Sequence, residues 1–361
     1  MPRISVFRAK VIALMILGIN SAAGSLNALY AAGPVTPPMF RIESQWNLGG
    51  AGGWGDPLLD SATHSLYIPR TDRVMVVDIE TGKESAEVTG FVGVRNIALD
   101  DDGRFGYVTD LTDGTAGFVR VFDRTSLKIV ASVPVGLNPD AVAFEPTTKT
   151  VFVFSTSARN ASILDTATNH VVATIALPAR PSSAVADGRG AVLVAMPGLG
   201  QIIRIDAAAR KISASWSLAP CVGPRGLAID RADRQLFAVC ENRKLIALNV
   251  NNGRVVFFRE VAEGTGELRF DSRHQLLFLT SGSGTLTIFR GRAGGFIKLQ
   301  ELNTLPGAQA LVISPEETKA YLVTAKFGQR TGNTSEELRY RPTPVVGSFT
   351  VLVVGHRLAP P

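Results

Sequence analysis

Short apolar runs, each closed by turn-forming residues, recur along almost the whole chain. The stretch from Gly93 to Pro139 shows the unit most clearly, because it contains four such runs at 96–99, 105–109, 118–122 and 128–135. Aspartate, serine and glycine separate these runs, and all three residue types favour tight turns. The pattern predicts a small four-stranded antiparallel sheet. One such sheet cannot cover its own apolar faces, so it needs neighbours of the same kind.

The unit repeats along the chain with two regular marks. An aspartate or asparagine closes an apolar run every 41 to 45 residues, at Asp78, Asp123, Asp165, Asp206 and Asn249. A second mark, mostly acidic, ends the first run of each unit, at Asp60, Asp100, Glu145, Asp187, Asp230, Asp271 and Ser314. A period near 40 residues is typical of propeller blades, and the spacing leaves no room for helices between strands. The seven marks therefore predict an all-β, seven-bladed β-propeller with four-stranded antiparallel blades.

The two ends of the repeat region predict how the ring closes. The last unit supplies strands at 320–324 and 348–354, and the chain then ends before a fourth strand. An unmatched strand, 40–48, precedes the first complete unit. We expect this N-terminal strand to complete the last blade, because an unpaired edge would promote aggregation.

One motif resembles a known family. Tyr107-Val-Thr-Asp110 nearly spells the signature of the YVTN repeat proteins, and Phe152-Val-Phe-Ser155 and Tyr321-Leu-Val-Thr324 are looser copies. These WD40-like repeats form exported seven-bladed propellers. The resemblance implies a periplasmic, secreted or cell-surface location and binding without catalysis. It carries over no catalytic residues, because the motif consists of scaffold positions.

The N-terminus has the layout of a secretory signal peptide. Basic residues at 3, 8 and 10 precede a nine-residue apolar run, and small residues follow it. The run is too short to span a bilayer. We expect residues 1–32 to be the signal, cleaved near residue 23 or 31, and residues 33–361 to form one propeller domain. Loss of the three basic residues lowers the formal net charge from +6 to +3. A net charge this small on a chain of this length does not by itself imply a nucleic-acid partner, and no transmembrane span is expected once the signal is removed.

The chain has two cysteines, Cys221 and Cys240. In the propeller register one lies in the loop entering a blade and the other ends that blade's second strand. Adjacent antiparallel strands bring Cβ atoms within bridging range, and exported proteins meet oxidising conditions. We expect a disulfide; two buried free thiols are the alternative.

Unlike polar residues fall at one repeated position, where the inner strand of each blade meets the channel mouth. Aligned blades place Gly55, Arg95, Asp140, Ser182, Arg225, Gly266 and Gln309 together, followed by Asp56, Asn96, Ala141, Ser183, Gly226, Glu267 and Ala310. Variable polar residues on a repeated frame are typical of a binding site. We therefore predict a ligand-binding set of Arg95, Asn96, Asp140, Arg180, Arg225 and Glu267. A channel rim of mutually paired charges is the alternative.

The longest loop, 325–347, should lie over the same mouth as a partial lid. A loop of this length on a compact frame is functional or disordered. Its predicted contact residues are Lys326, Arg330, Arg339, Tyr340 and Arg341. Arginines at this face suit carboxylate or phosphate groups, so we expect a protein partner or a small anionic ligand.

A rival interpretation is catalytic. Asp56, Asn96 and Glu267 offer three oxygen ligands suited to Ca²⁺ or another hard divalent ion, and propeller lactonases use an acid and amide set of that kind. This would make the chain a metal-dependent lactonase. We favour instead a monomeric, exported binding or scaffold protein without a cofactor.

Overall fold

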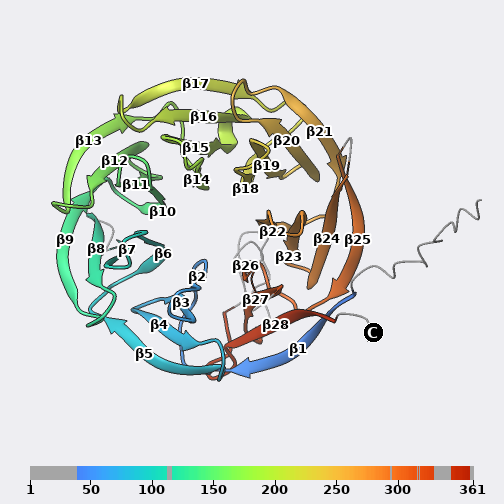
Figure 1. Cartoon of the computed structure of the whole chain (residues 1–361). Coiled ribbons are helices and arrows are strands. Elements are labelled where there is room, and N and C mark those ends of the chain that lie inside the picture. The colour runs from blue at the N-terminus through green and yellow to red at the C-terminus, as the bar shows by residue number, and fades with distance from the viewer. Residues whose placement is uncertain are drawn as a thin grey trace, which may run out of the picture. The chain divides into compact units, whose positions relative to one another are not determined.

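The computed structural model describes residues 39–111, 116–292, 295–314, 316, 318–328 and 343–357. The proposed signal segment, 1–32, lies outside these residues. Seven four-stranded antiparallel sheets are arranged in a ring, with the first strand of each sheet nearest the centre (Figure 1). This confirms the predicted seven-bladed propeller. In the described part of the chain, no helix has the length and apolar character that crossing a bilayer demands.

We number the blades 1 to 7 along the chain. Blade 1 contains β2 (Leu58–Asp60), β3 (Ser65–Arg70), β4 (Arg73–Asp78) and β5 (Lys83–Thr89); blade 2 contains β6 (Val94–Leu99), β7 (Phe105–Leu111), β8 (Gly117–Asp123) and β9 (Ile129–Val135); blade 3 contains β10 (Pro139–Glu145), β11 (Thr150–Ser155), β12 (Asn160–Asp165) and β13 (His170–Ala176); blade 4 contains β14 (Ala184–Ala186), β15 (Ala191–Met196), the 3₁₀ turn η1 (Pro197–Leu199), β16 (Gln201–Asp206) and β17 (Lys211–Ser217). Blade 5 contains β18 (Pro224–Asp230), β19 (Gln235–Cys240), β20 (Lys244–Asn249) and β21 (Val255–Glu260); blade 6 contains β22 (Thr265–Asp271), β23 (Leu276–Ser281), β24 (Thr285–Arg292) and β25 (Gly295–Asn303); blade 7 contains β26 (Ala310–Ser314), β27 (Lys319–Thr324), β28 (Thr350–Arg357) and β1 (Met39–Asn47).

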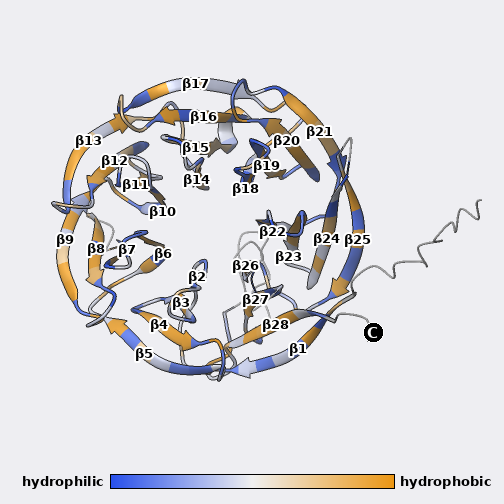
Figure 2. Ribbon diagram, in the orientation of Figure 1, coloured by the Kyte–Doolittle hydropathy of each residue, from blue (hydrophilic) through white to orange (hydrophobic). Residues whose placement is uncertain are grey.

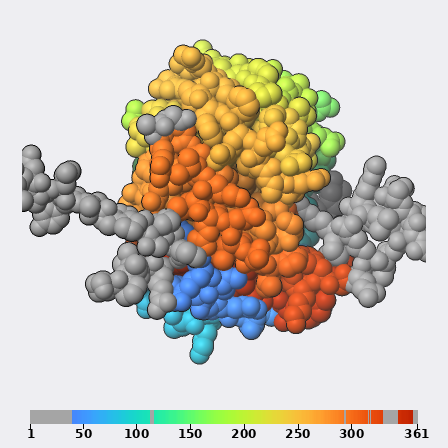
Figure 3. Space-filling view, turned by 90° about the vertical axis from the view of Figure 1, so that its right-hand side faces the viewer, coloured from blue at the N-terminus to red at the C-terminus, as the bar shows by residue number. Residues whose placement is uncertain are grey.

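Blade 7 joins the two ends of the described chain. β1 pairs antiparallel with β28, from Met39 opposite Arg357 to Asn47 opposite Thr350. Figure 3 shows the blue segment of β1 beside the red C-terminal strand on the surface of the ring. Gln300 of blade 6 also exchanges two hydrogen bonds with the backbone of Phe40, at 2.8 and 2.7 Å. The predicted closure by the N-terminal strand is confirmed.

The core lies between blades. Most buried apolar residues of the described chain fall into seven clusters, and each cluster combines side chains of two neighbouring blades. Third strands such as β4 are apolar and almost wholly buried, whereas outer strands such as β5 are mostly exposed (Figure 2). The neighbouring blades therefore cover the apolar faces of each sheet, as the sequence pattern predicted.

The acidic marks that revealed the repeat close its hairpins. Asp60, for example, accepts hydrogen bonds from the backbone N–H of Ala62 and the hydroxyl of Thr63, and Asp271 accepts from the N–H groups of Arg273 and His274. Such carboxylates satisfy turn N–H groups that would otherwise lack partners. We call the side of the ring on which these hairpins lie the hairpin face. The opposite side, where the connections enter the blades, is the loop face.

In blades 2 and 5, the last paired position of the second strand holds the connection that enters the blade. Asp110 accepts hydrogen bonds from the N–H groups of Val92 and Gly93, at 2.9 and 2.8 Å. Cys240 occupies the same register position in blade 5 and forms a disulfide with Cys221, with 5.6 Å between the Cα atoms. The final residue of the YVTN-like motif is thus a scaffold position, where different chemistry performs one task.

Candidate functional site

A shared irregularity lifts polar residues out of the inner strands at the channel mouth. The pairing register of β6, β10, β18 and β22 shifts between their first residue and their fourth. The two residues skipped in each blade are Arg95 and Asn96, Asp140 and Ala141, Arg225 and Gly226, and Gly266 and Glu267. These are the pairs that the sequence alignment placed together. Bulges of this kind re-aim side chains, here at the end of the strand on the loop face.

Threonines of the second strands hold two of these bulges. The hydroxyl of Thr109 accepts a hydrogen bond from the N–H of Asn96 and donates to the carbonyl oxygen of Asp140 in the next blade, at 2.9 and 3.2 Å. Thr280 does the same for Glu267 and Gln309, at 2.9 and 2.6 Å. Each threonine therefore fixes its own bulge against the neighbouring blade.

The glycines at this position serve packing. A Cβ atom on Gly55 would lie 1.6 Å from the carbonyl oxygen of Arg95 in blade 2, and one on Gly266 would lie 2.9 Å from the Cβ atom of Gln309 at blade 7. Two blades can approach so closely only where no side chain intervenes. The absence of polar side chains at Gly55 and Gly266 thus has a structural cause.

We expect Gly55→Ala to lower the free energy of unfolding by about 1–3 kcal/mol, because overpacking forces the first two blades apart. Gly198→Ala is the matched control, since no atom lies within 4 Å of its Cβ position. Guanidinium unfolding of both variants checks this. An equal effect of the two substitutions would contradict the assigned contact.

Acidic side chains from three blades lie close enough at the channel mouth to affect one another. Burial, together with the nearby charges of Glu267 and then Asp140, raises the pKa of Asp56 to about 7, although Arg269 opposes the shift. The Nη1 atom of Arg269 donates to Oε2 of Glu267 at 2.6 Å. Burial by itself would lower the pKa of Arg269, but attraction to Glu267 and Asp56 raises it. The mouth thus collects charged residues from blades 1, 3 and 6.

A second group joins blades 2 and 3. The side-chain amide of Asn96 donates to the carbonyl oxygen of Asp140 at 3.2 Å. Burial raises the pKa of the Asp140 carboxyl, and the charge of Arg95 partly offsets this. Arg95, Asn96 and Asp140 are therefore neighbours, as the predicted binding set requires.

The raised pKa of Asp56 predicts a pH-dependent stability. Between its unfolded value near 3.8 and its folded value near 7, the folded chain holds a proton that the unfolded chain releases. The contribution of Asp56 to stability is present at low pH and is lost as pH rises through this interval. Asp56→Asn should nearly match wild type at pH 4 and exceed it at pH 8 by up to about 4 kcal/mol, since one unit of pKa shift corresponds to about 1.4 kcal/mol. Unfolding free energies at both pH values check this, and a difference that does not change with pH would count against it.

Two members of the acid and amide set are already engaged within the protein. Glu267 is already paired with Arg269, and the Asn96 amide is bonded to Asp140. Across the described ranges, no three His, Cys, Asp or Glu side chains come close enough to hold a metal ion.

Cations surround the mouth on the loop face. Arg95, Arg180 and Lys326 are exposed, and no described acidic residue forms an ion pair with any of them. Arg225 is also exposed, but its guanidinium is paired with Glu241 of the same blade, with Nε 2.6 Å from Oε1. Three cations of the predicted set are thus available to a ligand.

Only the base of the long loop is described. The N–H of Val345 donates to the carbonyl oxygen of Lys326 at 2.8 Å, and Gly328 donates to Thr343 at 3.1 Å. These bonds tie the two ends of the loop together. The predicted contact residues Arg330, Arg339, Tyr340 and Arg341 lie outside the described residues.

Solved structures share this architecture. The structure of U3-55K has a TM-score of 0.68 at 11% identity, covering 87% of this chain and 98% of that one. The RRP9 WD40 repeats reach 0.70 at 12%, covering 89% and 99%. The hydrazine synthase of Kuenenia stuttgartiensis reaches 0.64 at 17%, covering 78% and 94%. These likenesses show the fold alone.

Sequence comparisons add no closer relative. No protein-family profile matches the chain, and no curated protein is significantly similar to it. The structural neighbours, one of which is named for its WD40 repeats, support the propeller fold, and the YVTN resemblance rests on the motif residues alone.

Sequence reasoning missed the residues that partner the predicted set. Arg269 lies two positions beyond Glu267 on β22, and residues two apart on a strand face the same side. The two-residue period of β-strands could therefore have identified Arg269 as a partner of Glu267. Glu241 is the first residue after β19, so only the folded hairpin shows its pairing with Arg225.

Proposed function

We propose that the chain is an exported, non-catalytic binding protein whose loop face takes a protein partner or small ligand bearing carboxylate or phosphate groups. The observation that carries the proposal is the set of exposed cations Arg95, Arg180 and Lys326, without ion-pair partners in the described chain, around the bulged channel mouth. Arginine binds planar anions with two hydrogen bonds. Exposed cations on a rigid frame can do so at little cost in conformational entropy.

The disulfide supports the export part of the proposal. Cys221 and Cys240 are both buried and bonded to each other. Disulfides persist in oxidising compartments and are rare in reducing ones. A periplasmic, secreted or cell-surface location fits this bond and the signal-like N-terminus.

The test compares two triple variants of equal charge change. Arg95→Ala/Arg180→Ala/Lys326→Ala removes the loop-face cations, and Lys83→Ala/Lys211→Ala/Arg254→Ala removes exposed cations of the hairpin face. The probe is a fluorescent oligo-glutamate peptide, followed by anisotropy at low and physiological salt. The loop-face variant should bind about tenfold more weakly than wild type or the control variant. Equal binding by both variants would refute the proposed surface.

One observation favours a second candidate, a lactonase-type hydrolase centred on Asp56, Asn96 and Glu267. A carboxyl with a pKa of about 7 is poised for proton transfer at neutral pH. The chain should be treated with chelator and assayed for lactone opening with Ca²⁺, Mn²⁺ or Zn²⁺ restored. Metal-dependent turnover that disappears in Glu267→Gln would replace the binding proposal, and no turnover would exclude this candidate.

A further inference from the structure

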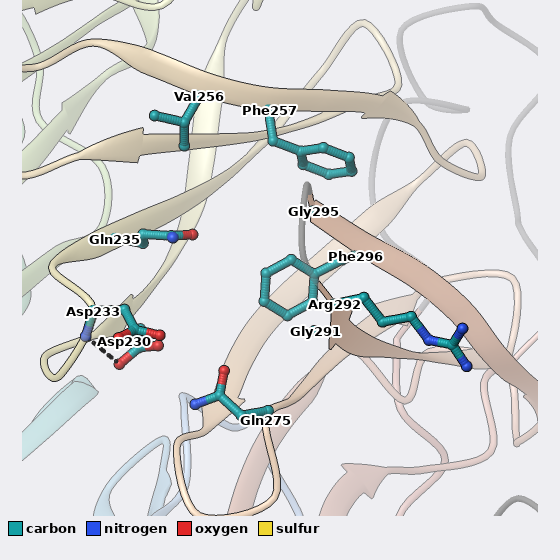
Figure 4. Close-up of a pocket in the computed structure, with 10 residues that line it drawn as sticks. All are labelled: Asp230, Asp233, Gln235, Val256, Phe257, Gln275, Gly291, Arg292, Gly295 and Phe296. Carbon is teal, nitrogen blue, oxygen red and sulfur yellow. Dashed lines mark hydrogen bonds between the residues drawn. The ribbon is translucent and has the colours of Figure 1, made fainter. Parts of the chain in front are cut away.

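A cleft of about 480 Å³ lies between blades 5 and 6, away from the channel mouth. Its residues come from the hairpins and outer strands of the two blades, and they are shown in Figure 4. The lining contains two carboxylates, two carboxamides and two aromatic rings, which belong to Asp230, Asp233, Gln235, Gln275, Phe257 and Phe296. Val256, Gly291, Arg292 and Gly295 complete it. This volume is in the range of small-ligand sites.

One carboxylate oxygen in the cleft has no partner in the described chain. Asp230 is 2% exposed, and its Oδ1 atom accepts hydrogen bonds from the N–H groups of Ala232 and Asp233. Its Oδ2 atom accepts none from the residues that the structure describes. Asp233 beside it likewise forms no ion pair within them. Because Asp230 lines the cleft, this oxygen has acceptor capacity left for a donor that enters there.

Two of the corresponding acids obtain that donor from an arginine of the next blade, whereas Glu145 accepts from the backbone N–H of Gly190 and Asp271 pairs with His274 of its own hairpin. Arg124 of blade 2 forms an ion pair with Oδ2 of Asp60. Arg234 of blade 5 donates to Oδ2 of Asp187 at 2.6 Å. In both cases a guanidinium enters the junction from the following blade and neutralises the hairpin acid of the preceding one.

Blade 6 has no arginine at either of these positions. Gln275 corresponds to Arg234, since both end the first hairpin with φ near 55°. Gly291 corresponds to Arg124, because each follows the residue paired with the first position of the second strand. Both Gln275 and Gly291 line the cleft. Figure 4 shows that the guanidinium of Arg292 points away from the two carboxylates.

We propose that this cleft binds the guanidinium group of an external ligand, which takes the place that Arg124 and Arg234 fill at their own blade junctions. Asp230 and Asp233 supply two negative charges, and the side-chain carbonyls of Gln235 and Gln275 are further acceptors. Phe257 and Phe296 also line the cleft, and they provide an apolar wall against which the alkyl chain of such a ligand can pack. The source is an arginine side chain of a peptide or a free guanidinium compound.

The experiment is calorimetric titration of the purified chain with three probes. Agmatine represents a free guanidinium compound, N-acetyl-arginine amide represents a peptide arginine, and N-acetyl-citrulline amide is the neutral isostere. We expect at least one guanidinium probe to bind about tenfold more tightly than the citrulline probe. Agmatine alone would identify a free compound as the source, and the arginine amide alone would identify a peptide. No saturable binding, or equal binding of citrulline, would overturn the proposal.

Three variants locate the binding. Gln275→Arg supplies the missing arginine at a backbone conformation that Arg234 already adopts, so it should abolish binding and leave the fold intact by thermal melting. Asp233→Asn should weaken binding about tenfold without removing the carboxylate that closes the hairpin. Asp102→Asn, an exposed acid of another hairpin, should bind as wild type does. Wild-type binding by both cleft variants, or by Asp233→Asn if Gln275→Arg does not fold, would place the ligand elsewhere.

Discussion

Deleting residues 1–47 is expected to make the protein aggregate. The deletion removes β1 and leaves the full length of β28 as an unpaired edge in blade 7. It also exposes apolar surface that Phe40 covers, since that ring packs edge-on against Phe278 at 5.5 Å. Open, apolar edges recruit further chains. Size-exclusion chromatography after refolding measures the outcome.

The matched control is deletion of residues 1–38, which keeps β1 whole. It should elute and melt as the longer chain does once any signal is removed. A synthetic peptide spanning 39–48 should partly restore solubility to the shorter chain, because it can add the missing strand. A soluble, cooperatively melting protein lacking residues 1–47 would show that the ring does not depend on this closure.

Replacing Arg70 with methionine is expected to lower the free energy of unfolding by about 4 kcal/mol, the second large effect. The side chain is fully buried. Its Nε and Nη2 atoms donate to the carbonyl oxygens of Gly53 and Ala51 at 3.1 and 2.8 Å, and its guanidinium lies 3.8 Å from the centre of the Phe349 ring. Methionine fills the space but leaves these carbonyls without donors, at about 1–3 kcal/mol each.

Two further variants separate the causes. Arg70→Lys keeps the charge but presents one compact donor group, so it should recover less than half of the loss. Arg73→Met removes an arginine whose partners, Asp72 and Glu87, are both exposed, and it should cost at most about 1 kcal/mol. Guanidinium unfolding ranks the three variants. A loss for Arg73→Met as large as that for Arg70→Met would rule out the buried contacts as the reason.

The sequence was sufficient for the fold because its regular marks have local causes. Asp60 and Asp271 bond the backbone of their own hairpins, so they recur wherever that turn recurs. Closure by β1 followed from counting strands, which needs no knowledge of distances. Asp110 likewise holds the connection just before its own blade.

The candidate site was only partly predictable, because its contacts join blades that are far apart along the chain. Aligning the blades brought Arg95, Asn96 and Asp140 to one position, and the structure makes them neighbours. The proximity of Asp56 to Glu267 depends on where blades 1 and 6 face each other across the channel. The cleft between blades 5 and 6 was not predicted from the sequence. Its signal is the absence of an arginine at Gln275 and Gly291, the positions that Arg234 and Arg124 occupy in other blades.

Closure in blade 7 also determines how the ring responds to mechanical load. Met39 and Arg357 are partners at the same end of the β1 and β28 ladder. Tension applied between these two residues would act across the hydrogen bonds and break them one after another, as in a zipper. A shearing load would have to break all of them together. A tether joining both ends of the chain to separate anchors would therefore release β1 at low force, and blade 7 would open before any other.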